Sequence, residues 1–533
     1  MIEVTKENFT EIYPQLKNDL ENADVIAIDT EFTGLECDEI SKISLFDTIE
    51  ERYENLRNTL EPFIIIQFGI TTLKKIHDKN EFIPKSYEFY LLPKSVFTKN
   101  KIISWQISVI EFLSYYSFNF NKVINHGISY VNQIEEAILN EQWKNNTLYK
   151  NVEESMSYKE KDDVNHFSSM IAEWLKNLNN KEIYTIPAFT DKFQYFLQKT
   201  LRERFRNIWT ICNKQTVQVF KISSDVREML ENEKEQSLEH ILLNSYIGFS
   251  NVFKLLVELK KPIIGHNILL DLMFMHKLFY KPLPRRYCDF KTEINNLFPI
   301  IYDTKYISNQ VKEKYEIQVL NSLGSLYCHF SNLAKTFPHI ADYTNNTSKN
   351  FHNAGWDSYC TGYIFLKMAY MFANDKYPLS FNYVITHEEL MSLIQEYANC
   401  INLSNANALY LKLDGKDPKW GRPPWLFLKT RESTHLDINE ISKELSQFGI
   451  FDIKPYNRGR ALIAVANHTS AYDILKHFHN NKELSIVRYN PIKHAPSMKY
   501  LLLGSVLVSS GMLAWIYHRS VSPKLSDRDL SCQ

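Results

Sequence analysis

The stretch DVIAIDTEFTGL, residues 24–35, decides the fold, because an apolar run typical of a buried strand ends in two acidic residues. Asp29 and Glu31 stand two positions apart. Side chains alternate along a strand, so both carboxylates should lie on one face. Neighbouring carboxylates offer the oxygen ligands that Mg²⁺ or Mn²⁺ prefers. An Asp-x-Glu pair arises by chance about once or twice in a chain this long, so two solvated acids are the alternative.

Further strand patterns surround this stretch. Residues 63–70 (FIIIQFGI) form a nearly continuous apolar run, which is typical of a strand buried on both faces. Residues 87–92 predict a third strand, and a helical pattern covers about residues 101–118. Strand-like residues 261–267 lead into a helix that runs to Tyr280. The pattern therefore predicts an α/β fold with a mixed sheet.

A third acidic residue, Asp271, lies on the predicted helix that follows Gly265, and a glycine at that position allows a tight strand-to-helix turn. Apolar residues flank Asp271 on both sides, over 268–270 and 272–274. A carboxylate inside such a run is costly to bury unless it is paired or bound to a metal. An exposed helix face remains the alternative.

His352 and Asp357 are five positions apart in the stretch HNAGWDS, residues 352–358. This spacing suits a His on a loop and an Asp on the first turn of the helix that follows. A lone His is more often a structural residue, and that interpretation stays open.

Taken in order, these residues give the pattern D-x-E…D…H-x4-D, which resembles the DEDDh class of 3′-to-5′ exonucleases on the ribonuclease-H-like fold. Within that class the chain is similar to the poly(A)-specific ribonuclease family, strongly over about residues 1–400 and weakly over 420–490. The similarity rests on residues 29–35, 67–69, 121–128, 265–271, 279–284, 303–305 and 352–362.

The resemblance implies a two-metal hydrolysis of phosphodiester bonds in single-stranded RNA, with two Mg²⁺ ions or with Mn²⁺ in their place. The implied metal ligands are Asp29, Glu31, Asp271 and Asp357. His352 would act as general base on the attacking water. Phe32 and Leu35, which follow the acidic pair, would stack against the terminal nucleotide of the RNA.

The composition excludes several other classes of protein. The 533 residues are 44% apolar and 14% aromatic, which excludes a mostly disordered chain. The 61 Lys and Arg balance 62 Asp and Glu, which excludes a uniformly basic nucleic-acid coat. The seven Cys form no CxxC pair, which indicates a reducing compartment and no zinc module. The N-terminus lacks the apolar region of a signal peptide.

The predicted organisation is a nuclease domain interrupted by a small inserted α/β subdomain and followed by a unit of order βαββαβ, which RNA-recognition (RRM) modules share. The insert lacks the His of the Arg-x3-His signature that the family carries there. The third strand of the βαββαβ unit, from Arg460, lacks paired aromatics, so packing or dimerisation is favoured over sequence readout. The boundaries are 1–165 and 246–405 for the nuclease, 166–245 for the insert, 420–492 for the RRM-like unit, 500–517 for a membrane segment and 518–533 for a tail.

Residues 500–517 (YLLLGSVLVSSGMLAWIY) carry no charge and would span about 27 Å as a helix. They predict a single-pass anchor with the nuclease in the cytosol, with the mitochondrial outer membrane favoured and the endoplasmic reticulum as the alternative. A buried C-terminal helix is the other interpretation.

With this anchor, the chain is similar to a membrane-anchored branch of the family that trims the 3′ ends of piRNA precursors. That resemblance implies a Tudor-domain partner and a PIWI-bound RNA, and the resemblance to the poly(A)-specific ribonuclease family implies a homodimer. A poly(A)-specific deadenylase and a non-catalytic RNA-binding scaffold at a membrane are the alternative functions.

Overall fold

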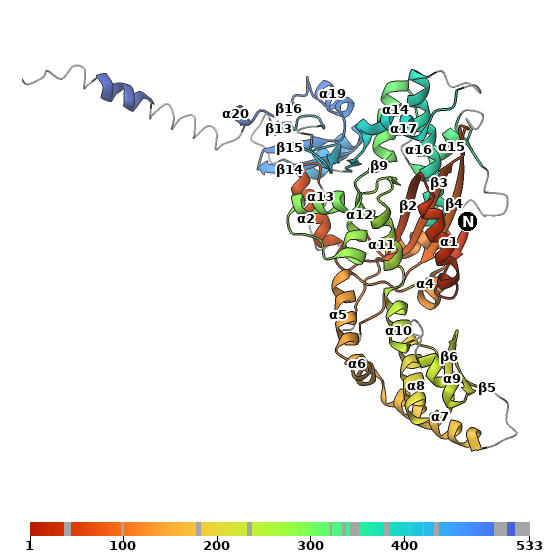
Figure 1. Cartoon of the computed structure of the whole chain (residues 1–533). Helices are drawn as coiled ribbons and strands as arrows, with labels where there is room; N and C mark the ends of the chain where they lie inside the picture. The colour runs from red at the N-terminus through yellow and green to blue at the C-terminus, as the bar shows by residue number, and fades with distance from the viewer. Residues whose placement is uncertain are drawn as a thin grey trace, which may run out of the picture. The chain divides into compact units, whose positions relative to one another are not determined.

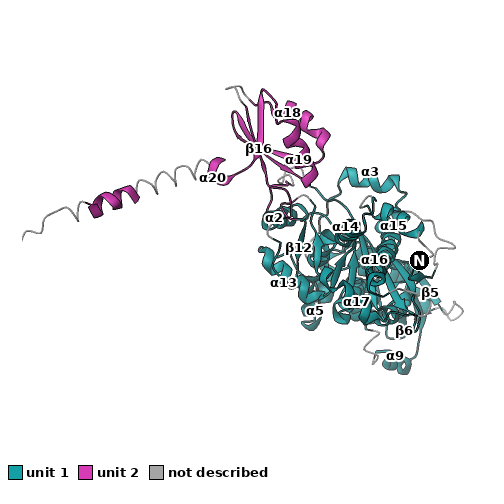
Figure 2. Cartoon of the chain, turned by 90° about the horizontal axis from the view of Figure 1, so that it is seen from above, with its two compact units in different colours: residues 1–42, 49–404, 409–419 teal, residues 43–48, 405–408, 420–533 magenta. Residues whose placement is uncertain are grey.

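The computed structural model describes thirteen stretches of the chain and divides it into two compact units (Figure 2). The described residues are 1–36, 44–96, 101–176, 183–231, 237–319, 322–332, 337–341, 351–377, 383–404, 406–418, 421–430, 436–494 and 509–517. Unit 1 comprises Met1–Lys42, Ile49–Ser404 and Leu409–Lys419, and unit 2 comprises Ile43–Thr48, Asn405–Ala408 and Trp420–Gln533.

Unit 1 is built on a mixed seven-stranded sheet of order β1-β4-β3-β2-β8-β9, with β10 paired to β4. β2 is antiparallel to β3 and parallel to β8, so it lies in the interior of the sheet. Such a strand is covered on both faces, which explains its apolar run. The strands are β1 (Ile2–Val4), β2 (Val25–Phe32), β3 (Ile65–Lys75), β4 (Glu81–Tyr90), β8 (Ile263–Gly265), β9 (Ile301–Asp303) and β10 (His339–Ile340).

The long helix α16 (Ala354–Lys376) packs across β2 and β3 and is buried over most of its length (Figure 1). Two glycines allow this close approach. A Cβ at Gly69 would lie 1.8 Å from the carbonyl oxygen of Ala354, and one at Gly362 would lie 2.7 Å from the Leu73 side chain. The N-terminus of α16 is therefore held directly against β3.

The helix predicted over residues 101–118 is shorter in the structure. α3 runs from Ile107 to Tyr115, and Ser117 follows with a left-handed φ of 62°. The other helices of unit 1 outside the insert are α1 (Phe9–Glu21), α2 (Ile49–Thr59), α4 (Phe120–His126), α11 (Ser250–Leu259), α12 (Leu269–Met275) with a π-helical turn (His276–Tyr280), α13 (Tyr287–Leu297), α14 (Thr304–Tyr315), α15 (Leu323–Asn332) and α17 (His387–Ile394). β11 (Cys400–Asn402) and β12 (Tyr410–Lys412) form a separate hairpin.

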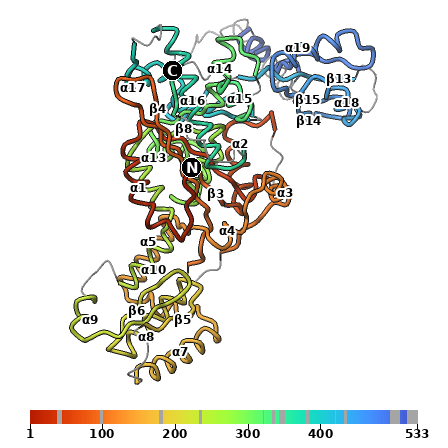
Figure 3. Tube along the Cα trace, turned by 90° about the vertical axis from the view of Figure 1, so that its right-hand side faces the viewer, coloured from red at the N-terminus to blue at the C-terminus, as the bar shows by residue number. Residues whose placement is uncertain are grey.

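The inserted region forms a three-stranded antiparallel sheet of order β5-β7-β6 with helices packed on it (Figure 3). Its apolar core joins α7, α8 and α10 to the strands. The elements are α5 (Gln133–Lys144), α6 (Leu148–Ser155), α7 (Tyr158–Lys176), β5 (Ile183–Pro187), α8 (Asp191–Arg204), β6 (Ile208–Asn213), β7 (Thr216–Lys221), α9 (Ser224–Glu231) and α10 (Leu238–Ile247). The subdomain limits 166 and 245 stay predictions.

Unit 2 contains a four-stranded antiparallel sheet of order β14-β15-β13-β16, with its elements in the chain order βαββαβ. Alternate residues of each strand form its core with the two helices, for example Leu426, Ile463 and Ile486 with Ile441 and Ile474. The elements are β13 (Leu426–Thr430), α18 (Ile438–Leu445) with a 3-10 turn (Ser446–Phe448), β14 (Phe451–Asn457), β15 (Arg460–Val465), α19 (His468–His477), β16 (Leu484–Arg488) and α20 (Pro491–His494).

The predicted membrane anchor is contradicted. Among the helices of the described stretches, none is both long enough and apolar enough to cross a membrane. Of the predicted segment, residues 500–508 lie outside the described residues, and residues 509–517 are helical. The single-pass anchor, and the membrane locations that followed from it, are therefore wrong.

Candidate active site

Asp29 and Glu31 lie at the end of β2, opposite β3. The register pairs Asp29 with Gly69 and Glu31 with Gln67, and it becomes irregular only after Glu31. The period-2 alternation is thus intact between the two acids, so both side chains leave the sheet on the same face. The same face receives the N-terminus of α16 at Gly69.

Asp271 reaches this region from the first turn of α12. Its Oδ1 accepts a short hydrogen bond from the Thr30 hydroxyl, which joins the helix to β2 between the two acids. The turn before α12 differs from the prediction, because the residue with the left-handed φ is Asn267, at 61°, and not Gly265. Gly265 serves close packing instead, since a Cβ there would lie 2.4 Å from the Ile268 side chain.

Asp303, a fully buried residue, holds the turn before α12 in place. Its Oδ1 accepts from the backbone N–H groups of Asn267 and Lys305, both at 2.9 Å. Its Oδ2 accepts from the N–H groups of Ile268 at 3.3 Å and Asn402 at 3.0 Å. One carboxylate therefore fixes the backbone from which Asp271 projects.

His352 and Asp357 come from the loop before α16 and from its first turn. The backbone N–H of His352 donates to Asp357 Oδ2 at 2.9 Å. Two residues further on, the N–H of Ala354 donates to Gln67 Oε1 at 2.8 Å, and Gln67 Nε2 donates to the buried Glu88 at 2.6 Å. The loop that carries His352 is thus tied to both β3 and β4.

The structure brings the predicted acids and the His together. One ligand atom each of Glu31, His352 and Asp357 lies within 4.8 Å of the others. Burial, followed by repulsion from the neighbouring carboxylates, raises the pKa of Asp29 and of Glu31 well above the usual range. Because four acids share this site, ionising all of them requires a compensating positive charge.

Burial also raises the pKa of Asp271 and of Asp357, each to about 7. In Asp271 the hydrogen bond from Thr30 opposes this rise, and in Asp357 the N–H of His352 does so. Burial lowers the pKa of the His352 imidazole, so the ring is neutral near pH 7. Perturbed groups clustered in this way are typical of catalytic sites.

The donor set fits a divalent cation. Asp357 Oδ1 is buried and accepts no hydrogen bond within the part of the chain that the structure describes. A buried carboxylate oxygen without a donor is costly, and a cation would satisfy it. Carboxylate oxygens are the ligands of Mg²⁺ and Mn²⁺, so Asp29, Glu31, Asp271 and Asp357 would hold such ions.

Phe32 and Leu35 follow the acidic pair, as the sequence suggested. The Phe32 ring stacks on the buried Phe274 with centroids 4.4 Å apart, and it stays partly exposed. The backbone N–H of Leu35 donates to Gln106 Oε1 at 3.0 Å. Both residues therefore present apolar surface from anchored positions, and their stacking against RNA stays a prediction.

Gln67, Glu88 and Asp303 support the site, and the sequence did not assign them this function. Gln67 and Asp303 lie in stretches on which the family resemblance rested, which was the available signal. The partner of Gln67 lies 287 positions away and the most distant partner of Asp303 lies 99 positions away, so local sequence could not predict these roles.

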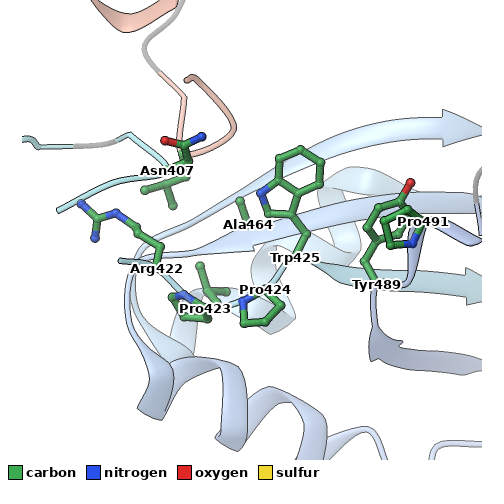
Figure 4. A pocket seen from close by; sticks show the side chains of 10 residues that line it. Asn407, Arg422, Pro423, Pro424, Trp425, Ala464, Tyr489 and Pro491 are labelled. Atoms are coloured by element: carbon green, nitrogen blue, oxygen red, sulfur yellow. The ribbon is translucent and has the colours of Figure 1, made fainter. Parts of the chain in front are cut away.

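Two other features do not belong to this site. In the insert, Arg202 stacks over Trp209 at 3.5 Å and donates to the hydroxyl and carbonyl oxygens of Thr210, so its guanidinium is committed to internal contacts. In unit 2, a cavity of about 320 Å³ is lined by residues such as Pro424, Trp425 and Tyr489 (Figure 4). The described residues that line it include no carboxylate or His, so the acidic cluster is not part of this cavity.

Comparison with known proteins gives a consistent result. The model of the CAF1 family of ribonucleases matches residues 4–365. The chain is 31% identical to the pre-piRNA 3′-exonuclease trimmer of Bombyx mori, over 97% of this chain and 99% of that protein. It is 27% identical to the poly(A)-specific ribonuclease PNLDC1 of Mus musculus, again over 97% and 99%. It is 29% identical to the poly(A)-specific ribonuclease PARN of Xenopus laevis, over 69% of this chain and 62% of that protein.

Proposed function

The chain belongs to the CAF1 family of ribonucleases and is a 3′-to-5′ exoribonuclease, and from this premise we propose that it trims the 3′ ends of single-stranded small-RNA precursors. The observation that carries the proposal is the convergence of Asp29, Glu31, Asp271 and Asp357 beside His352. The substrate is proposed from similarity to the Bombyx trimmer, which is 31% identical to this chain, against 27% for PNLDC1 over the same share of both chains.

The residues of the site divide the chemistry among them. Divalent metal ions, held by the four carboxylates, would supply the positive charge that activates water and stabilises the leaving oxygen. His352, kept neutral by burial, accepts a proton from the attacking water. Phe32 and Leu35 contact the terminal nucleotide, and stacking of this kind orders a single strand without strong sequence readout.

Deadenylation is the second candidate function, because PNLDC1 and PARN carry the name of poly(A)-specific ribonucleases. Competition between two 5′-labelled RNAs in one reaction separates the candidates. One RNA ends in mixed sequence and the other in oligoadenylate, and both have the same 5′ portion. Equal shortening supports trimming, whereas shortening of the oligoadenylate end alone overturns it in favour of deadenylation.

We infer that unit 2 is an RRM-like module with a role other than base stacking. The strand order β14-β15-β13-β16 supports the first part. For the second, Phe427 of β13 is covered by other rings: His494 of α20 stacks on it at 4.3 Å and 8°, and Tyr456 of β14 packs edge-on at 6.1 Å. The hydroxyl of Tyr456 donates to the carbonyl of His494 at 3.1 Å, which fixes α20 there. The Tudor-domain partner, the PIWI-bound RNA and the homodimer stay predictions.

A further inference from the structure

His352 packs against two aromatic residues at the C-terminal end of α3. The ring centroid of His352 lies 4.5 Å from that of Phe112 and 4.1 Å from that of Tyr116. Phe112 and Tyr116 contact each other as well, with centroids 5.0 Å apart, as their spacing of four residues on a helix allows. The three rings therefore contact one another in pairs, and the Tyr115 ring packs edge-on against Tyr116 at 5.1 Å from outside them.

The contacts with Phe112 and Tyr116 determine the rotation of the His352 side chain, which the backbone leaves open. The backbone of His352 is set by its bond to Asp357 and by the bond of Ala354 to Gln67, and its φ is 65°, in the left-handed region. Neither arrangement sets the rotation of the imidazole. The ring makes no hydrogen bond to any residue that the structure describes, so aromatic contact is what holds its orientation.

Helix α3 is suited to provide this contact because it is anchored next to the acidic strand. The Gln106 side chain, which precedes the helix, accepts from the N–H groups of Leu35 at 3.0 Å and Glu36 at 3.2 Å. The N–H of Gln106 donates to the carbonyl of Thr33 at 2.8 Å. One end of the α3 segment is thus tied to the residues after β2, and the other end touches His352.

Packing in the hydrophobic core does not explain the aromatic residues Phe112 and Tyr116. Leu113 is the buried residue of α3, whereas Phe112 is 43% exposed and Tyr116 is partly exposed. Tyr115, the neighbour of Tyr116, is 82% exposed. What distinguishes Phe112 and Tyr116 from Tyr115 is that both pack against the His352 ring.

We propose that Phe112 and Tyr116 are positioning residues, which hold the His352 ring with a nitrogen facing the carboxylates of Glu31 and Asp357. The proposal rests on the proposed function, since it assigns a role within the same reaction. Without the Phe112 and Tyr116 rings the imidazole rotates among several orientations, and only in some of them does its nitrogen reach the attacking water. A misplacement of about 1 Å costs on the order of 100-fold in rate.

The test compares four variants of the full chain in single-nucleotide removal from a 5′-labelled RNA. Tyr116→Leu and Phe112→Leu should each lower kcat by roughly 10-fold to 100-fold and leave KM within about 2-fold. Tyr116→Phe keeps the ring and should stay within about 3-fold of wild type. Tyr115→Leu is the matched control: Tyr115 packs on Tyr116, but among the described residues it has no ring contact with His352, so the variant should retain wild-type kcat.

Thermal stability separates positioning from folding, so Tm is measured for every variant. A wild-type kcat in Tyr116→Leu overturns the proposal, and so does a rise in KM at unchanged kcat, which would make Tyr116 an RNA contact. Equal losses in Tyr115→Leu and Tyr116→Leu overturn it too.

A second readout is independent of catalysis. Ring currents from Phe112 and Tyr116 should displace the NMR resonance of the His352 ring, and the displacement should shrink in Tyr116→Leu and persist in Tyr115→Leu. If wild type is no more active than Asp29→Asn, the proposed function fails. The NMR comparison still decides whether Phe112 and Tyr116 orient the His352 ring. An unchanged resonance in Tyr116→Leu overturns the inference.

Discussion

Replacing Asp357 by Asn should stabilise the metal-free protein at pH 8 while it abolishes hydrolysis. Burial raises the pKa of Asp357 from 3.8 to about 7. An acid whose pKa is raised by folding binds its proton more tightly in the folded state, so stability falls as the pH rises from about 4 to about 7. Above that window the folded protein contains a buried, unfavourable charge, and Asn removes it.

The magnitude follows from the shift. One pKa unit corresponds to about 1.4 kcal/mol, so ionised Asp357 lowers the free energy of unfolding by at most roughly 4 kcal/mol above this pH range. For a folding unit as large as unit 1, removing this destabilisation should raise Tm by roughly 3–5 °C. The Asn carbonyl can still accept from the N–H of His352, so the loop is retained. At pH 5 most of the penalty is absent, and the gain should fall to less than half.

The assay is thermal denaturation in a chelator at pH 5 and pH 8, followed by circular dichroism. Asp303→Asn is the matched control, since it is another buried Asp→Asn change beside the site. Both oxygens of Asp303 accept backbone N–H groups, so an amide NH₂ there faces donors and should lower Tm at both pH values. An Asp357→Asn protein less stable than wild type at pH 8, or equally stabilised at both pH values, refutes the reasoning.

Four further predictions concern metal binding, the pH profile, the packing of α16 and the insert. Mg²⁺ at about 100 times its Kd should stabilise the wild-type protein by about 2.7 kcal/mol and leave the Tm of Asp29→Asn unchanged, and equal shifts in calorimetry would argue against binding at the acids. The pH of half-maximal activity should fall as Mg²⁺ rises, because ligands whose pKa is about 7 must ionise to bind it; a pH profile independent of Mg²⁺ would contradict this. Gly69→Ala should cut activity at least 10-fold, since its Cβ would meet the carbonyl of Ala354 and displace the start of α16, and an active variant with wild-type Tm would speak against that packing. Arg202→Ala should destabilise the insert by about 1–3 kcal/mol with little change in kcat. Limited proteolysis and a kinetic assay measure both; an insert of unchanged stability with reduced kcat would show instead that Arg202 binds the RNA.

Local patterns predicted the elements that carry the acids. The apolar runs at 24–28 and 63–70 correspond to β2 and β3, and the alternation of Asp29 and Glu31 survives because the register between these strands is regular up to Glu31. The helix that bears Asp271 and the one that bears Asp357 were also expected from their flanking residues.

The parts that sequence could not supply depend on distant partners. The strand order, in which β2 lies between β3 and β8, is set by packing that no single stretch records. Asp303 collects N–H groups from three separate segments, and Gln67 bonds to a residue 287 positions away. Composition also misled: the uncharged run at 500–517 predicts a spanning helix, whereas no helix of the described stretches is long and apolar enough to be one.

The central claim, that the acidic cluster hydrolyses RNA from a free 3′ end, is tested most directly with linear and circular forms of one RNA. Full-length protein is incubated with each form and Mg²⁺, beside Asp29→Asn as the inactive control. The account predicts that 5′-labelled linear RNA shortens stepwise with wild type, persists with Asp29→Asn, and that the circle stays intact with both. Cleavage of the circle, or stepwise shortening by Asp29→Asn, would contradict it.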